Sequence, residues 1–227
     1  MASGKQRVRS RIVWTLFVVC LLLFAAGWTI RSYARFGEQL SAVAGMTLGD
    51  TRGEVKYKLG VPPTVSGSNE PGEAGARAYY TDAQSDPANA LPDGADIDNY
   101  RIWSYNNGSL SGPHIDLTFD GSSGRVSKIT CIDHSDPPSG YCGRLLGVGI
   151  GDPEDRLTSV LGTPTRQFID ERLGTKSMDY ADIGAAFLLA KQRVYGIAIV
   201  GTGIQKQPPW DRFLMWYLSE LKAELRP

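Results

Sequence analysis

The chain has 227 residues, enough for one ordinary domain or two small ones, and its 42% hydrophobic content is sufficient for a buried core. Its 24 basic and 24 acidic residues cancel, so no net field favours nucleic acid as a partner. Basic residues gather before residue 12, directly ahead of a long apolar run.

This apolar run, residues 12–30, contains no charged residue. At 1.5 Å per residue it spans roughly 28 Å, close to the hydrocarbon core of a bilayer. Trp14 and Trp28 lie near its ends, where interfacial aromatic residues are enriched. The excess of basic residues before the run predicts a cytoplasmic N-terminus and a periplasmic C-terminal domain. We therefore expect a single-pass anchor that contacts the lipid bilayer of a bacterial inner membrane. A cleaved signal peptide is the alternative, which the length of the run disfavours.

The sequence then repeats itself. The Gly-Met-Thr-Leu-Gly-Asp motif at 45–50 returns as Gly-Val-Gly-Ile-Gly-Asp at 147–152, and the Leu-Gly-x-Pro motif at 59–62 returns at 161–164, both with an offset of 147 − 45 = 102 residues. Such a repeat indicates two similar structural units. Between its two motifs, each copy is predicted to form a short helix, capped by the aspartate and ended by the Gly-x-Pro turn.

Alternating strand patterns follow each helix. In the first copy they cover 101–105, 114–119 and 125–132, and in the second 177–181, 185–190 and 193–200. The motif at 103–105 corresponds to 178–180 with an offset of 75, and Phe119 corresponds to Phe187 with an offset of 68. We therefore predict an α+β fold, in which each copy is a short helix packed on a small antiparallel β-meander.

This order of motifs resembles the SmpA/OmlA (BamE-like) family. The matching residues are Gly45, Met46, Thr47, Val55, Leu59, Gly60, Pro62, Trp103, Tyr105, Leu117, Phe119, Gly124, Val126 and Ile129. A tandem pair of such units is similar to the β-lactamase inhibitor protein group. The resemblance implies a non-catalytic, protein-binding role. The family is lipidated and its units usually occur singly, whereas this chain has no lipobox and is doubled.

Cys131 and Cys142 flank a run of turn-forming residues between the two copies. In an exported, oxidising compartment they are expected to form a disulfide. A metal site that adds His134 is the alternative, disfavoured because a fourth soft ligand and a CxxC pair are missing. Neither His114 nor His134 lies in a recognisable catalytic motif. We expect no enzyme activity, no cofactor and no metal.

Two segments exceed what the repeated unit needs. The first is the acidic insertion at 66–100, either a mobile loop or one ordered by a partner, with Tyr79 and Tyr80 as candidate contacts. The second is a C-terminal amphipathic helix, which packs on its own sheet or docks on a partner or on the membrane surface. Its candidate partner-binding residues are Trp210, Phe213, Trp216 and Tyr217.

These observations predict the following division of the chain: a basic tail and transmembrane anchor (1–36), a first repeat (37–134) with the insertion (66–100), a second repeat (135–207) and the C-terminal helix (208–227). The expected function is a non-enzymatic scaffold, an accessory or stabilising subunit of a respiratory, photosynthetic or transport complex of the inner membrane. Its partners would be other membrane or periplasmic protein subunits. An envelope biogenesis factor linked to outer-membrane β-barrel assembly and an enzyme-inhibitor-like binding module are the alternatives.

Overall fold

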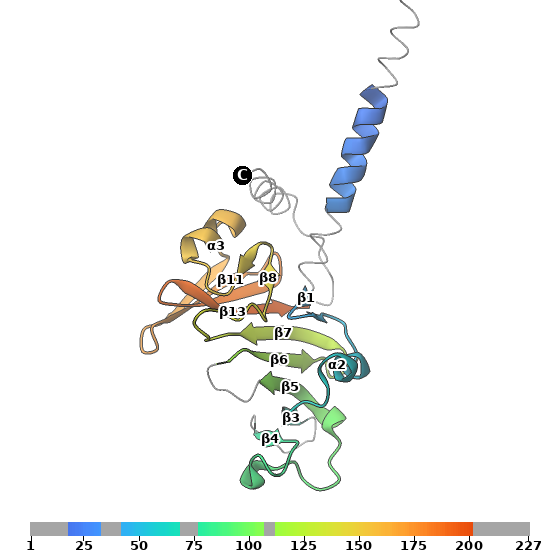
Figure 1. Ribbon diagram of the computed structural model, residues 1–227, viewed down its shortest axis with the longest axis vertical. Helices are drawn as coiled ribbons and strands as arrows, with labels where there is room; N and C mark the ends of the chain where they lie inside the picture. Colours follow the sequence, from blue (N-terminus) through green and yellow to red (C-terminus); the bar gives the residue numbers. More distant parts are fainter. Residues whose placement is uncertain (1–17, 33–41, 69–76, 107–111, 202–227) are drawn as a thin grey trace, which may run out of the picture.

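The computed structural model describes residues 18–32, 42–68, 77–106 and 112–201. Its centre is a nine-stranded sheet in the order β10-β11-β12-β13-β7-β6-β5-β3-β4, with every neighbouring pair antiparallel. Figure 1 shows the strands from β13 to β4 stacked in this order along the molecule.

The two copies supply the elements in the same order. The first copy forms β1 (Ala42–Val43), β2 (Met46–Thr47), α2 (Arg52–Leu59), β3 (Thr64–Ser68), β4 (Ala78–Tyr80), η1 (Pro87–Asn89), η2 (Ile97–Asn99), β5 (Tyr100–Asn106), β6 (His114–Phe119) and β7 (Val126–Ile132). The second forms β8 (Arg144–Leu145), β9 (Val148–Gly149), α3 (Glu154–Leu161), β10 (Arg166–Asp170), β11 (Thr175–Tyr180), β12 (Ala185–Ala190) and β13 (Arg193–Val200).

The predicted α+β class, with a transmembrane helix followed by two separate meanders, is wrong. The protein is mainly β, because the two meanders join edge to edge in one sheet and each copy adds only one short α-helix. The strand patterns nevertheless lie close to where alternation predicts them, in β5, β6, β7, β11, β12 and β13.

The predicted single-pass inner-membrane location is also wrong. In the described parts of the chain, no helix is both long and apolar enough to cross a membrane. The described part of the N-terminal helix covers residues 18–32. Trp28 lies in this helix with 54% of its surface exposed.

The pairing registers show that the copies share one structure. Thr64 pairs with Ser104, and Arg166 pairs with Asp179, which gives offsets of 166 − 64 = 102 and 179 − 104 = 75. The register shift between β6 and β7 also has a counterpart between β12 and β13. The repeated sequence therefore encodes a repeated set of strand pairings.

The alignment of β6 with β12 differs from the predicted one. Trp103 pairs with Leu117, and Met178 pairs with Phe187, so β6 corresponds to β12 with an offset of 187 − 117 = 70. Phe187 is therefore the counterpart of Leu117 and not, as predicted, of Phe119. The β12–β13 hairpin is two residues shorter than the β6–β7 hairpin (70 − 68 = 2). The sequence comparison missed this difference because it matched Phe187 with Phe119.

The copies meet where β7 pairs with β13, from Ile132 opposite Gly196 to Lys128 opposite Val200. β7 and β13 correspond with an offset of 68 residues. Replacing each residue by its counterpart in the other copy therefore turns the Ile132–Gly196 pair into the Val200–Lys128 pair. The central pair, Thr130 and Ala198, is converted into itself because 198 − 130 = 68. A local two-fold axis therefore passes through this pair and relates the two halves of the sheet.

One face of the sheet carries the core and both α-helices. A row of facing, buried residues crosses it: Trp103, Leu117, Ile129, Ile199, Ala185 and Tyr180. The first residue of each helix binds the sheet. The Arg52 guanidinium lies 4.4 Å from the centre of the Phe119 ring, and a carboxylate oxygen of Glu154 lies 2.7 Å from Nζ of Lys176.

The helix caps lie one residue later than predicted, at Thr51 and Pro153. Asp50 and Asp152 instead accept a hydrogen bond from the backbone N–H three residues earlier, at 2.9 Å in both copies. Each aspartate thus closes the turn that leads into its helix.

Two glycines test the packing of the turns in the second copy. Gly174 and Gly184 both have φ of +64°, but a Cβ at Gly184 would lie 2.8 Å from the Val200 carbonyl oxygen, whereas one at Gly174 would meet nothing within 4 Å. Both alanine substitutions share the left-handed strain, about 1 kcal/mol. We expect Gly184→Ala to cost roughly 1–3 kcal/mol more because it overpacks the turn against β13. Urea unfolding of both variants measures this difference, and equal losses would contradict the close approach.

Candidate protein-interaction face

The opposite face of the sheet carries neither α2 nor α3, and we call it the helix-free face. One row of facing residues crosses it through all nine strands: Tyr80, Thr64, Ser104, Asp116, Thr130, Ala198, Ala186, Asp179 and Arg166. Because side chains alternate along a strand, this row points away from the core row. Apart from Asp116, the middle of the row consists of small uncharged side chains, and its ends carry an aromatic ring and a charged pair.

A second row on the helix-free face contains an apolar spot near the two-fold axis. Ile132 faces Gly196, which faces Leu188. A Cβ at Gly196 would lie 3.0 Å from Cδ1 of Leu188 and 3.2 Å from Cγ1 of Ile132. The two aliphatic side chains therefore pack over the glycine backbone, where a larger residue would not fit.

Polar groups flank that spot on both sides, since His114 pairs with Ile132 and Ser177 pairs with Leu188. Arg166 donates from Nε and Nη2 to the same oxygen of Asp179, at 3.0 and 2.8 Å, and Ser177 Oγ donates to its other oxygen at 2.9 Å. The hydrogen bonds from Arg166 are the main cause that lowers the pKa of Asp179. His114 lies in the first copy, with Nε2 3.9 Å from Asp116 Oδ2. The face thus combines charged groups with an apolar centre.

The two candidate tyrosines of the insertion lie on opposite sides of β4. Tyr80 is partly exposed on the helix-free face, opposite Thr64. Tyr79 is 6% exposed, and its ring centre lies 5.7 Å from that of Tyr100. Tyr80 therefore remains a candidate contact, whereas Tyr79 packs inside. The other aromatic candidates, Trp14, Trp210, Phe213, Trp216 and Tyr217, lie outside the described residues.

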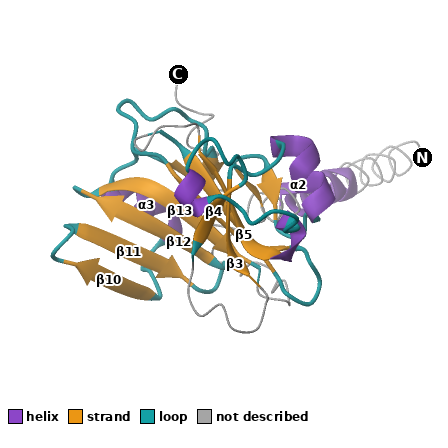
Figure 2. Ribbon diagram, turned by 90° about the horizontal axis from the view of Figure 1, so that it is seen from below, coloured by secondary structure: helices purple, strands orange, loops and turns teal. Residues whose placement is uncertain are grey.

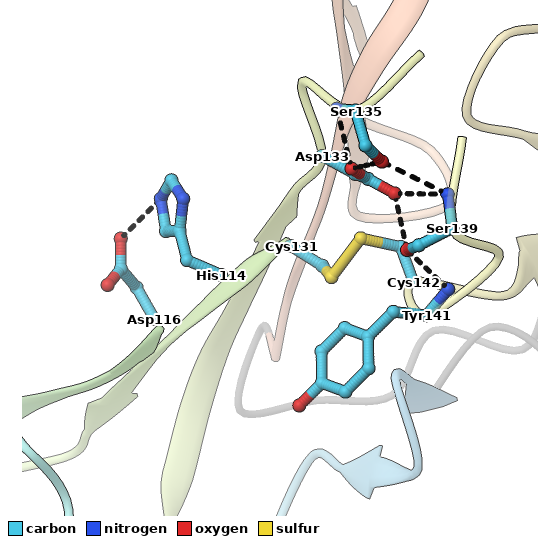
Figure 3. Close-up of a disulfide and its surroundings, with 8 residues drawn as sticks. All are labelled: His114, Asp116, Cys131, Asp133, Ser135, Ser139, Tyr141 and Cys142. Atoms are coloured by element: carbon cyan, nitrogen blue, oxygen red, sulfur yellow. Dashed lines mark hydrogen bonds and ion pairs between the residues drawn. A yellow bond between two sulfur atoms is a disulfide. The ribbon is translucent and has the colours of Figure 1, made fainter. Parts of the chain in front are cut away.

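The link between the copies is closed by the predicted disulfide. Cys131 and Cys142 are bonded, with Cα atoms 5.6 Å apart and 11 residues of sequence separation. Cys131 belongs to β7, so the link starts from the strand at the centre of the sheet (Figure 3). His134, the third residue of the alternative metal site, stacks on Tyr195 at a ring distance of 4.9 Å. In the described part of the chain, no cluster of His, Cys, Asp or Glu is suited to hold a metal ion.

Asp133 organises this link, and Figure 3 shows its carboxylate between two serines. Ser135 donates from its N–H at 2.9 Å and from its hydroxyl to one oxygen. Ser139 donates from its N–H at 2.9 Å and its hydroxyl at 2.6 Å to the other. Burial alone would raise the pKa of Asp133, but these hydrogen bonds outweigh it and lower the pKa. The network closes a loop and leaves no carboxylate oxygen to act on a substrate.

Apart from Tyr80, the residues of the helix-free face were not singled out from the sequence. Their signal was present in the alternation of β6, β7 and β12, whose outward positions are the ones left between the apolar residues. The sequence alone does not reveal that these strands share one sheet, so it does not place the outward residues side by side. The pairing of β7 with β13 brings them together.

Comparisons with known proteins add no function to this surface. No family model and no curated protein matches the chain. Among solved structures, the crystal structure of a DUF4309 family protein (YjgB) from Bacillus subtilis subsp. subtilis str. 168 is 15% identical, with 70% of this chain and 83% of that chain covered and a TM-score of 0.38. A likeness at this level carries no argument, and the resemblance to the SmpA/OmlA family stays a prediction.

Removing the disulfide should destabilise the protein. Without the bond, the unfolded chain is no longer closed into a loop between the two cysteines, which are 11 residues apart, and its conformational entropy rises. We therefore expect the Cys131→Ala/Cys142→Ala double variant to lose about 2–4 kcal/mol of stability. Cys20→Ser is the control, because this cysteine is free and exposed. Denaturant unfolding measures the stability of both variants. Equal stability would show that the disulfide does not stabilise the protein.

Asp133 should contribute stability that depends on pH. Its folded pKa is lowered, so the contribution is present above the unfolded value of about 3.9 and is lost as the pH falls through the folded pKa. Asp133→Asn should cost about 1–3 kcal/mol at pH 7 through lost buried hydrogen bonds. It should also make stability less dependent on pH below 4. Acid titration of unfolding compares it with Asp136→Asn, an exposed residue of the same link. Similar curves for both variants would exclude this role of Asp133.

Proposed function

We propose that this chain is a non-enzymatic, protein-binding scaffold and that the helix-free face of its sheet is the binding surface. The observation that carries the proposal is the composition of the row through Thr130 and Ala198, which crosses all nine strands on the face that neither α2 nor α3 covers. A broad sheet face of this kind matches the area of a partner protein better than that of a small ligand.

The energetics of such a contact are favourable. Apart from Asp116, the side chains in the middle of the row are Ser, Thr and Ala, which lose little rotamer freedom when they are buried. The backbone beneath them is held on both sides by strand pairing, so it is organised before binding and little ordering entropy is lost. Tyr80 at one end and Arg166 at the other belong to the residue types that are enriched in energetically important contacts.

The polar networks support binding in preference to catalysis. The Asp133 carboxylate accepts hydrogen bonds from its own link on both oxygens. Asp179 is likewise engaged by Arg166 and Ser177. The buried Asp133 fixes the geometry of the link. The Arg166–Asp179 pair lies on the helix-free face and holds its charges in place, which provides specificity for a partner. An enzyme-inhibitor-like module is the second candidate, because the chain is a tandem pair of similar units, the feature on which its resemblance to the β-lactamase inhibitor protein group is based.

Site-specific photo-crosslinking in the natural host tests the proposal. A benzophenone amino acid at Thr130 should give a discrete adduct with a partner protein. The same group at Tyr57, a residue of α2 with 92% exposure, should give none. Ala186→Arg, placed on the same face, should weaken the purified complex at least tenfold, about 1.4 kcal/mol. Adducts at Tyr57 but not at Thr130 would refute this binding surface. If the cross-linked partner is an enzyme and the purified chain inhibits it, the chain is an enzyme-inhibitor-like module, the second candidate.

A further inference from the structure

The two ends of the sheet differ although the copies are otherwise equivalent. At one end, β4 from the insertion pairs with β3, with Thr64 opposite Tyr80 and Ser66 opposite Ala78. At the other end lies β10, the counterpart of β3, and no described strand pairs with its outer edge. Figure 2 shows β10 at the margin of the sheet. The second copy has no insertion to supply a counterpart of β4.

The edge of β10 carries the charged residues Arg166 and Asp170 but lacks other usual forms of protection against pairing. Its five residues contain no proline or lysine, and its pairing with β11 shows no register shift. Phe168 is 66% exposed, Ile169 is 58% exposed, and Leu173 in the following turn is 62% exposed. An exposed, apolar and regular edge strand is a template for strand addition.

The sequence of β10 is complementary to itself in one register. Two antiparallel copies centred on Phe168 place Arg166 opposite Asp170 of the partner and Asp170 opposite the partner's Arg166. Opposite charges that face one another stabilise paired strands. In a symmetric antiparallel pair of identical strands, one residue lies opposite its own copy at the centre, so the neighbouring registers are centred on Gln167 or Ile169. The register centred on Gln167 would place Phe168 opposite Arg166. The register centred on Ile169 would place Arg166 opposite Arg172.

We propose that β10 pairs with β10 of a second copy of this chain, antiparallel and centred on Phe168, so that two nine-stranded sheets join into one. Facing residues of paired strands point to the same side. The helix-free faces of the two copies would therefore form one continuous surface, with the two Phe168 rings packed at its centre. The contact is isologous, as a closed two-fold dimer requires.

This contact repeats the construction of the protein itself. The pairing of β7 with β13 already joins two units antiparallel about a local two-fold axis. The β10 strand has only five residues, so the buried area falls below the roughly 800 Å² per partner of a standard interface. We therefore expect a dissociation constant in the micromolar range or weaker, and the test must detect a reversible dimer.

Cysteine cross-linking of the full chain tests both the occupant and the register. In a Cys20→Ser background, Phe168→Cys places each new thiol opposite its own copy. Ile169→Cys is the matched control, since its thiols would be diagonal neighbours about 7–8 Å apart, beyond disulfide reach. Both side chains are exposed, so neither change removes core packing. Under mild oxidation at about 100 μM, we expect the Phe168→Cys dimer to form at least tenfold faster.

Charge reversal provides an independent readout. Asp170→Arg in the Phe168→Cys background faces Arg166 with a like charge and should slow cross-linking severalfold. Glu171→Arg makes the same charge change in the turn beyond the strand and should leave the rate unchanged. The proposal would be overturned if the two cysteine variants cross-linked at equal rates, if Ile169→Cys cross-linked faster, or if neither variant gave a cross-linked dimer. No effect of Asp170→Arg would overturn the register.

Discussion

The pairing of β7 with β13 is the interaction on which the rest of this structure depends. Each copy alone would leave a central strand with an unpaired edge, and a meander with one short helix has little core to stabilise it. Joining the copies satisfies both edges and makes the core row continuous from Trp103 to Tyr180. The Thr130–Ala198 pair, at the local two-fold axis, is thus the centre of both the core-bearing and the helix-free face.

On this symmetric framework, three features distinguish the two copies. The insertion adds β4, which covers one end of the sheet and places Tyr80 on the helix-free face. The disulfide and Asp133 fix the link that starts the second copy. The absence of an equivalent insertion leaves β10 at the other end with Phe168 exposed. Repetition explains the architecture, and differences between the copies explain where partners are expected.

Local signals in the sequence predicted the local structure. The Leu-Gly-x-Pro motifs end α2 and α3 with glycines at φ of 82° and 73°, the alternating patterns became strands, and Cys131 bonds Cys142. The joined sheet was not predictable from these signals, because pairing between distant strands leaves no local pattern. Short strands such as β3 and β10, which contain Gly, Ser, Gln and Asp, lack a clear alternation. The apolar run at 12–30 suggested a membrane span from composition alone, which the described helix does not support. The helix-free face followed only once the strand order was known.

The most direct test of this account is amide hydrogen exchange of the native chain in increasing denaturant. If β7 and β13 unite the copies into one cooperative sheet, the slowest amides of β6 and of β12 should open with the same free energy, within roughly 1 kcal/mol, and with the same dependence on denaturant. If β6 loses its protection while β12 keeps several kcal/mol more, or the reverse, the copies unfold as separate units and the central role of the β7–β13 pairing is contradicted.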